Sequence, residues 1–324
     1  MTLPAARRGI AVGLGVLAAV AAPFFLSPFW LRIATGAFMW VALAQSWNII
    51  GGYAGYLNFG HGAFFGVGAY ATGILMTHYG VPALPAWLAS GFLSAGLALA
   101  VGVPTLRLKG AYFAIATWAF AEMLMQTSKV LTITGGPYGM RLPPLLDERF
   151  FYYAMLAAMG LTLAVVYWGV ERSMFGYQLK AIRENEQAAE TLGIATTATK
   201  LRAFVLSAFF PGVIGGIYAY WITYIHPESV LGALITDRMV IMVLLGGIGT
   251  FLGPVIGGMV LALMERIIWV VWGESAIYIV IIGAVICLVV LYMPSGIVGL
   301  IQERIARRLR RSVETGVVHG SAER

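Results

Sequence analysis

The uncharged stretch LPAWLASGFLSAGLALAVGV, residues 84–103, decides the fold class. A helix of about 20 apolar residues crosses the roughly 30 Å hydrocarbon core of a bilayer, and this stretch is long enough to do so. Similar runs, largely apolar, recur along the chain at 10–26, 31–50, 51–75, 111–129, 151–170, 201–225, 238–268 and 276–293. The sequence therefore predicts an all-α, polytopic integral membrane protein.

The composition agrees with a membrane location. Hydrophobic residues make up 60% of the 324 positions, charged residues 11%, and the mean hydropathy is +0.85, whereas soluble domains carry about 25% charged residues. The single cysteine, Cys287, excludes an intrachain disulfide, and the four histidines form no recognisable metal motif. No GxxxxGK[ST] motif occurs, so we expect no cofactor and no ATP binding by this chain.

The distribution of basic residues predicts the orientation. The run at 238–268 is too long for one span, and GGIGTFLGP at 246–254 divides it, which gives about ten spans in total. With the N-terminus in the cytoplasm, the residues on the cytoplasmic side are Arg7, Arg8, Arg107, Lys109, Arg172, Lys180, Arg183, Lys200, Arg202 and the arginines of the C-terminal tail. Fewer remain outside: Arg32, Lys129, Arg141, Arg149, Arg238 and Arg266. The positive-inside rule therefore favours cytoplasmic termini at both ends.

This topology divides the chain into five parts. They are a cytoplasmic N-terminus (1–9), six membrane spans (10–170), a cytoplasmic loop (171–200), four further spans (201–300) and a basic cytoplasmic tail (301–324). The series AAVAA near the first run resembles a signal-peptide cleavage site, but further spans follow, so we expect an uncleaved first helix.

One polar segment, GYQLKAIRENEQAAETLGI at 176–194, separates two of the apolar runs. Ile182, Ala189 and Leu192 recur at roughly helical spacing, and a glycine such as Gly193 commonly closes a helix in the left-handed conformation. A short charged helix between membrane spans lies in water or against a soluble partner. The candidate contact residues are Gly176, Tyr177, Gln178, Leu179, Lys180, Ala181, Ile182, Arg183, Glu184, Asn185, Glu186, Gln187, Ala188, Ala189, Glu190, Thr191, Leu192, Gly193 and Ile194.

The glycine-dense run at 51–75 carries polar groups that are costly in lipid. Its glycines let helices approach closely, or let the backbone turn inside a protected cavity. The polar side chains either line a water-filled path or form interhelical hydrogen bonds, and both interpretations stay open. A similar glycine-rich sequence at 246–249 also follows an apolar helix, and paired interruptions of this kind can mark a substrate path. The candidate path residues are Asn48, Gly52, Gly55, Asn58, His61 and Glu122.

Intramembrane charges are few. Glu122 lies inside the run at 111–129, toward its outer end, where it is a proton carrier, a partner in a structural hydrogen bond or a residue near the membrane interface. The pairs Asp237/Arg238 and Glu265/Arg266 fall near the expected ends of spans, where a charge reaches water, so we interpret both as helix ends.

Several motifs together resemble the LivM-type permease subunits of branched-chain amino-acid ABC importers. QAAETLG at 187–193 has the AAxxxG spacing of the permease loop of ABC importers, although Gln187 stands where a glutamate commonly precedes the alanines. The other matching stretches are NIIGGYAGYLNFGHGAFFGVGAY at 48–70, LRLKGAYFAIATWAFAE at 106–122, TGGPYG at 134–139 and VLLGGIGTFLGPVIG at 243–257. Their order and spacing match across 38–299, most of the chain.

The resemblance implies a function and a set of partners. The expected function is passage of leucine, isoleucine and valine across a bacterial inner membrane, as a permease and not an enzyme. The implied partners are a LivH-like sister permease, two ATP-binding subunits, and a periplasmic or lipid-anchored substrate-binding protein. In this family the loop that corresponds to 176–194 seats in a groove of an ATPase subunit. From the charge pattern, the tail arginines are expected to contact anionic membrane lipid or to hold the orientation, and no nucleic-acid partner is expected.

Two alternatives stay open. The first is an importer of the same class for urea or short-chain amides, and the second is a proton-coupled secondary transporter that uses Glu122. An intramembrane enzyme ranks far below these hypotheses, because the sequence has no HExxH, no GxSxG and no paired intramembrane aspartates.

Overall fold

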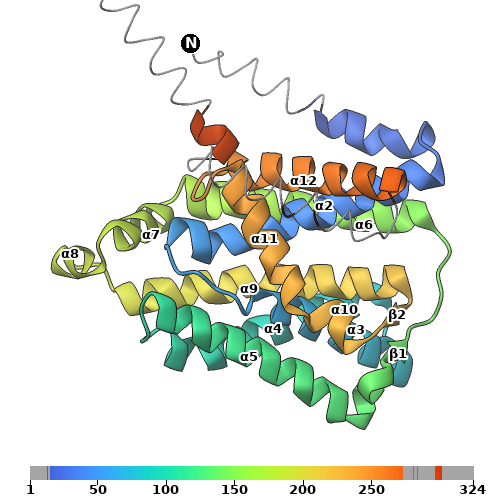
Figure 1. Cartoon of the computed structure of the whole chain (residues 1–324), viewed down its shortest axis with the longest axis horizontal. Helices are drawn as coiled ribbons and strands as arrows, with labels where there is room; N and C mark the ends of the chain where they lie inside the picture. The colour runs from blue at the N-terminus through green and yellow to red at the C-terminus, as the bar shows by residue number, and fades with distance from the viewer. Residues whose placement is uncertain (1–12, 14, 273–279, 281–282, 284–295, 301–324) are drawn as a thin grey trace, which may run out of the picture.

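The computed structural model describes residues 13, 15–272, 280, 283 and 296–300. Most of the expected last span (276–293) and the whole tail (301–324) therefore lie outside the described residues. The described chain is all-α apart from one short ribbon, which confirms the predicted fold class (Figure 1). The elements are η1 (Ala22–Phe24), α2 (Pro28–Asn48), η2 (Ile49–Tyr53), α3 (His61–Tyr79), α4 (Ala83–Thr105), α5 (Ala111–Val130), η3 (Thr132–Thr134), η4 (Gly136–Tyr138), β1 (Met140–Arg141), α6 (Glu148–Val166), η5 (Tyr167–Glu171), α7 (Met174–Glu184), α8 (Glu186–Thr191), α9 (Thr196–Ile222), β2 (Tyr224–Ile225), α10 (Pro227–Leu231), α11 (Ala233–Gly246) and α12 (Leu252–Trp272).

Several helices are suited to a bilayer. Within the described residues, five helical segments are long and apolar enough to cross a membrane: Pro28–Tyr53, Ala83–Thr105, Glu148–Glu171, Thr196–Ile222 and Pro227–Gly246. The total of about ten spans stays a prediction.

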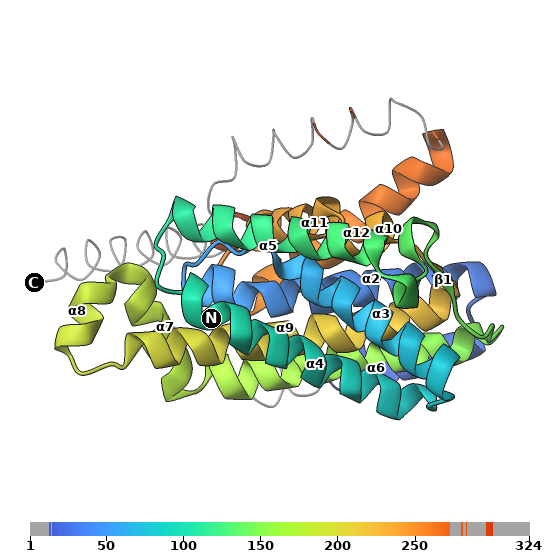
Figure 2. The ribbon, with the colours of Figure 1, turned by 90° about the horizontal axis from the view of Figure 1, so that it is seen from below.

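The bundle has two distinct ends. The helices α7 and α8 lie at one end in both views, and the ribbon formed by β1 and β2 lies at the other (Figures 1 and 2). At the α7–α8 end, the Tyr53 hydroxyl at the end of η2 donates to the Glu171 carboxylate at the end of η5 over 2.7 Å. At the ribbon end, Arg32 near the start of α2 pairs with Glu148 at the start of α6 over 3.3 Å. Thus α2–η2 and α6–η5 run in the same direction through the bundle.

Both predicted glycine-rich interruptions break helices. The helix α2 ends in the π-helical turn η2, residues 54–60 are not helical, and α3 begins only at His61. Gly55 adopts a φ of 76°, a conformation that L side chains rarely take. The predicted division of the 238–268 run is confirmed, because α11 ends at Gly246 and α12 begins at Leu252.

Small residues allow α3, α4 and α9 to pack closely at the core. A Cβ atom added at Gly68 of α3 would lie 2.0 Å from the carbonyl oxygen of Gly212 in α9. The Ser90 hydroxyl of α4 donates to that same Gly212 oxygen over 3.1 Å, and the Ser94 hydroxyl donates to the Phe64 carbonyl over 3.0 Å. Close backbone approach and hydrogen bonds replace the hydrophobic effect, which is weak between helices in lipid.

This packing predicts that Gly68→Ala destabilises the protein by about 1–3 kcal/mol or more, because the added methyl group overlaps the facing backbone. The matched control is Gly96→Ala in α4, where an added Cβ meets nothing within 4 Å. Melting temperatures of the detergent-purified variants check the expectation. Equal melting temperatures for the two variants would contradict the close α3–α9 contact.

Candidate functional site

Most of the polar segment at 176–194 forms two short helices, α7 and α8, which are joined at Asn185. The Ser173 side chain caps α7 by accepting from the Gly176 N–H, and the Asn185 side chain caps α8 by accepting from the Ala188 N–H. Gly193 has a φ of 84°, which confirms the predicted left-handed termination. The sequence predicted one helix here; the extended backbone of Asn185 divides it into two.

Glu186, the first residue of α8, holds this end of the bundle together. Its carboxylate accepts from Lys200 of α9 at 2.5 Å and from the Tyr56 hydroxyl at 2.6 Å, and Lys109 lies 3.6 Å away. The Lys200 ammonium, with a side chain only 3% exposed, also donates to the Tyr56 oxygen over 3.0 Å. One carboxylate thereby joins α8, α9, the non-helical 54–60 segment and the α4–α5 turn.

The electrostatics of this cluster favour the ionised carboxylate. Burial alone raises the pKa of the Glu186 carboxyl. The hydrogen bonds from Lys200 and Tyr56, together with the positive charges of Lys200 and Lys109, outweigh that effect, so the pKa of Glu186 lies below its usual value. Removal of either charge would leave the other buried without its main partner.

A second connection joins α7 to the two helix breaks. The Arg183 guanidinium donates from Nη1 to the carbonyl oxygen of Gly52 in η2 over 2.9 Å. A Cβ added at Gly249, in the turn between α11 and α12, would lie 2.1 Å from the same nitrogen. Arg183 therefore lies where the two breaks meet.

Asn48 connects the two breaks directly. Its side-chain oxygen accepts from the Gly249 N–H, and its side-chain nitrogen donates to the Thr250 carbonyl, each over 2.9 Å. The candidate path residue Gly52 lies one helical turn further on, and a Cβ there would come 2.7 Å from the Gly249 nitrogen. The two glycine-rich sequences, similar in composition, thus lie side by side in the fold.

Asn58 and His61 form a separate, fully buried cluster. The Asn58 amide nitrogen and His61 Nδ1 are 3.3 Å apart, and His61 Nε2 lies 3.1 Å from the Ser46 hydroxyl oxygen. Because an amide nitrogen only donates, Nδ1 accepts and Nε2 carries the proton. Trp47 donates from Nε1 to the Asn58 carbonyl over 2.8 Å. Each of these polar groups has a partner within the chain, and a role in a substrate path stays a prediction.

Glu122 makes its side-chain hydrogen bond within its own helix. Glu122, which is half-buried, accepts from the exposed Gln126 over 2.5 Å, one turn further along α5. None of the other candidate path residues is among its hydrogen-bond partners.

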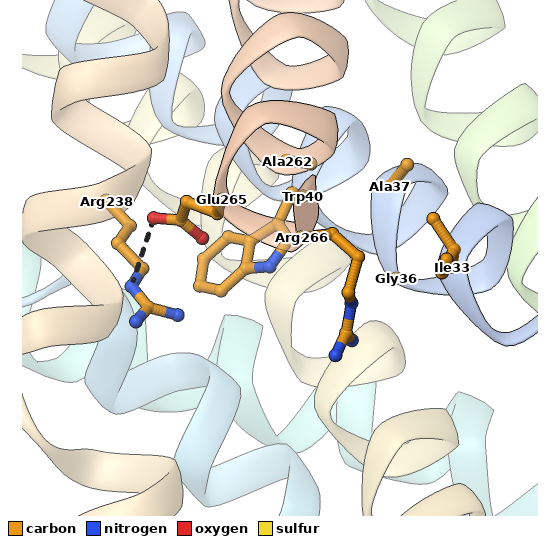
Figure 3. Close-up of a pocket in the computed structure, with 8 residues that line it drawn as sticks. All are labelled: Ile33, Gly36, Ala37, Trp40, Arg238, Ala262, Glu265 and Arg266. Carbon is orange, nitrogen blue, oxygen red and sulfur yellow. Dashed lines mark ion pairs between the residues drawn. The ribbon is translucent and has the colours of Figure 1, made fainter. Parts of the chain in front are cut away.

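A charged pocket lies halfway along the bundle, and the sequence did not single it out. Arg238 of α11 pairs through Nε with Glu265 of α12 over 3.7 Å, and its guanidinium lies 5.5 Å from the centre of the Trp40 ring. Figure 3 shows the Trp40 ring between this pair and Arg266. The pocket encloses about 160 Å³ and is completed by Ile33, Gly36, Ala37 and Ala262.

The depth of this pocket corrects one interpretation. Trp40 is near the centre of the Pro28–Tyr53 span, so the charges beside it lie far from either end. Arg238 is inside α11, and Glu265 and Arg266 are inside α12, which continues to Trp272. The interpretation of these pairs as helix ends is therefore wrong. A charged side chain at the centre of a bilayer costs about 2.5–3.5 kcal/mol or more, so such residues usually serve function.

Comparison with known proteins identifies the type of protein that this architecture resembles. Residues 29–290 match the family described as "Branched-chain amino acid transport system / permease component". The chain is 28% identical to the high-affinity branched-chain amino acid transport system permease protein LivM of Salmonella typhimurium, over 89% of this chain and 74% of that relative. No solved structure matches the chain.

Two further relatives extend the comparison. The permease protein LivH of the same Salmonella system is 25% identical, over 85% of this chain and 96% of LivH. A probable branched-chain amino acid transport permease protein LivM of Methanocaldococcus jannaschii is 24% identical, over 80% of this chain and 90% of that relative. The match to both permease types extends across most of the chain.

Proposed function

The chain belongs to the family of permease components of branched-chain amino acid transport systems, and from this we propose that it is one of two membrane-spanning subunits of an ABC importer. In this proposal, it forms a pathway for leucine, isoleucine and valine together with a LivH-like sister permease. Two ATPase subunits drive the transport, and a periplasmic or lipid-anchored binding protein delivers the substrate. The observation that carries the proposal is the family match across 29–290, supported by the mid-depth charged pocket.

The α7–α8 end is the docking surface for an ATPase subunit in this proposal. The carboxylates of Glu186 and Glu190 are engaged within the chain, by Lys200 and by the Thr196 hydroxyl. The outward surface therefore consists of other residues, among them Gln187, Ala188 and the 80% exposed Leu192. A small alanine and an exposed leucine suit close apolar docking in a groove of a partner. Arg183 and Glu186 would transmit movement of α7 and α8 to the helix breaks and to α9.

We expect Leu192→Asp to prevent the ATPase subunits from copurifying with the permease, because a charge at the centre of a docking contact opposes desolvation. The control is Leu146→Asp at the opposite end of the bundle, where the leucine is 97% exposed. Both variants should retain the melting temperature of the unchanged protein. Retention of the ATPases by Leu192→Asp would contradict docking at α8.

The charged pocket favours an amino acid over urea or a short-chain amide. Arg238 and Glu265 present opposite charges within one pocket at mid-depth, and these complement the carboxylate and ammonium groups of a zwitterion. Urea and simple amides have no ionised group that could pair with either side chain. Competition for uptake by the complete importer tests this: leucine, isoleucine and valine should compete with labelled leucine, and urea and acetamide should not. Effective competition by urea would contradict the amino-acid substrate and support an importer of urea or short-chain amides.

The structure offers less support for proton coupling. Glu122, the residue which that alternative requires, is half-buried and hydrogen-bonded to its helical neighbour Gln126. Uptake by this chain alone, driven by an imposed proton gradient without ATP, would establish the alternative.

The proposed location is a bacterial inner membrane with both termini in the cytoplasm. This orientation places the α7–α8 end, with Lys109, Lys180, Arg183 and Lys200, on the cytoplasmic side where the ATPases are.

A further inference from the structure

A second pocket adjoins the charged pocket and shares two of its residues. Trp40 and Arg238 belong to both pockets. The second pocket encloses about 220 Å³, and its apolar lining includes Met39, Leu234 and Ile235. Glu228 and Ser229 line it as well, and the Glu228 carboxylate is paired with Lys129 over 3.1 Å. A charged pocket and an apolar pocket thus meet across one tryptophan and one arginine at mid-depth.

We propose that the two pockets form one binding site in the permease for the α-amino acid being transported, a proposal that rests on the function proposed above. Glu265 binds the ammonium group, and the Arg238 guanidinium binds the carboxylate. The branched aliphatic side chain lies in the apolar pocket against Met39, Leu234 and Ile235. The class of ligand is therefore a zwitterion with a branched hydrocarbon side chain.

The chemistry of the lining supports this assignment. Arg238 directs Nε towards Glu265, and a guanidinium carries five N–H donors in a planar fork that matches a carboxylate. The Glu265 side chain is only 11% exposed, so its charge is shielded from water by protein. Arg266 also lines the pocket and lies beyond the Trp40 ring from Arg238 in the view of Figure 3. The charges and the apolar lining together match both halves of a branched-chain amino acid.

The position of the site indicates why charges are present there: a role in substrate binding accounts for them better than a purely structural ion pair does. The pocket lies on the face made by α2, α11 and α12, and the Arg238 side chain is 40% exposed there. Hydrocarbon cannot solvate a guanidinium, so protein or water must cover this face. A pathway between two permease subunits supplies both, which makes the pocket one wall of that pathway.

The first test uses the complete importer in proteoliposomes with labelled leucine. Arg238→Gln and Glu265→Gln should each lower the initial uptake rate by about 100-fold, the scale expected when a charge that contacts the oppositely charged end of the bound substrate is removed. The matched control is Arg32→Gln: Arg32 lies 5.5 Å from the Trp221 ring and 3.3 Å from Glu148, much as Arg238 lies beside Trp40 and Glu265. The uptake rate of the control should stay within about twofold of the rate of the unchanged importer, because an exposed ion pair contributes little. Unchanged uptake in both pocket variants would overturn the site.

A charge exchange separates binding from structure. In the double variant Arg238→Glu with Glu265→Arg, the ion pair can re-form with its charges exchanged. Its melting temperature should therefore be closer to that of the unchanged protein than the melting temperatures of the two single variants are. Leucine uptake should stay about 100-fold low, because each charge then faces the wrong end of the substrate. Recovered uptake would show a structural ion pair and overturn the proposal.

Thiol labelling tests access to the pocket directly. Gly36 lines the charged pocket, and an added Cβ there meets nothing within 4 Å, so Gly36→Cys fits. In a Cys287→Ala background of the complete importer, a charged, water-soluble methanethiosulfonate should label this cysteine, and excess leucine, but not urea, should slow the reaction. Gly160→Cys, near the middle of α6 and equally open, is the control and should label slowly from lipid. Equally slow labelling at both positions would overturn the proposal.

Failure of this site is distinguishable from failure of the proposed function. An unchanged importer that takes up leucine with ATP, but whose pocket variants are unaffected, refutes only the site. An unchanged importer without ATP-dependent leucine uptake refutes the function as well.

Discussion

Replacement of Lys200 by methionine is expected to lower the free energy of unfolding by about 3–5 kcal/mol, because it leaves the Glu186 carboxylate without its main buried partner. Methionine keeps much of the apolar stem, so the change mainly removes the charge. The 2.5 Å pair and the shared Tyr56 hydroxyl make this the most buried ionic contact among the described residues. Chemical denaturation in mild detergent measures the effect.

The control for this variant is Lys180→Met. The ion pair of Lys180 with Glu171 spans 3.3 Å, but both side chains are roughly one-third exposed. Exposed pairs contribute about 0–1 kcal/mol, so the control should lose far less stability. Equal losses in the two variants would contradict the central role of Lys200 at this end of the bundle.

The same contact gives a pH dependence with a defined sign. The folded pKa of Glu186 is lowered, so its stabilising contribution is complete above the ordinary carboxyl pKa of about 4.3. The contribution is lost as the pH falls through the lowered value. The melting temperature of the unchanged protein should therefore converge on that of Glu186→Gln in acid. A difference that stays constant with pH would contradict the lowered pKa.

Asn48→Ala is expected to have the second large effect. It leaves the Gly249 N–H and the Thr250 carbonyl, both partly buried, without their side-chain partner, and each group left unpaired costs up to about 1–3 kcal/mol. Hydrogen exchange of the Gly249 amide should become faster, because its hydrogen bond holds the α11–α12 turn against α2. Mass spectrometry of the peptide that contains this turn measures the exchange.

The control for Asn48 is Thr77→Val, which removes a 3.4 Å hydrogen bond from an exposed hydroxyl to the Arg141 carbonyl. Neither stability nor exchange at Gly249 should change in this variant. Unchanged exchange in Asn48→Ala as well would mean that the two breaks are held together by other contacts.

Much of the helical architecture was predictable, because its cause is local in the chain. The uncharged run around Ser94 must be a membrane helix, and it became α4. The glycines at 246–249 mark a break because glycine and the following Pro254 disfavour a continuous helix, and α11 does end there. The division of the polar segment at Asn185 has a local signal too, since asparagine is a preferred N-cap, but the helical periodicity across it obscured that signal.

The contacts that build the site were not predictable from one sequence. Asn48 meets Gly249 and Glu186 meets Lys200 because of tertiary packing, and no pattern in the chain specifies either partner. Arg238 and Glu265 were misplaced for a physical reason. A hydropathy window ends at a charge, so a charge inside a membrane helix is taken as its end unless the partner across the helices is known. One feature of the sequence did carry a signal. The apolar run at 238–268 is too long for one span and has a charged pair near each end, which is the pattern expected when two charges pair across two helices in the middle of the membrane.

Initial leucine uptake by proteoliposomes that contain the complete importer tests the proposed function most directly. The assay compares vesicles that contain ATP, vesicles that lack it, and vesicles in which this chain is present without its partners. We expect uptake only when ATP, the ATPases, the sister permease and the binding protein are all present. Leucine accumulation by this chain alone without ATP, or no accumulation by the complete ATP-loaded importer, would contradict the proposal.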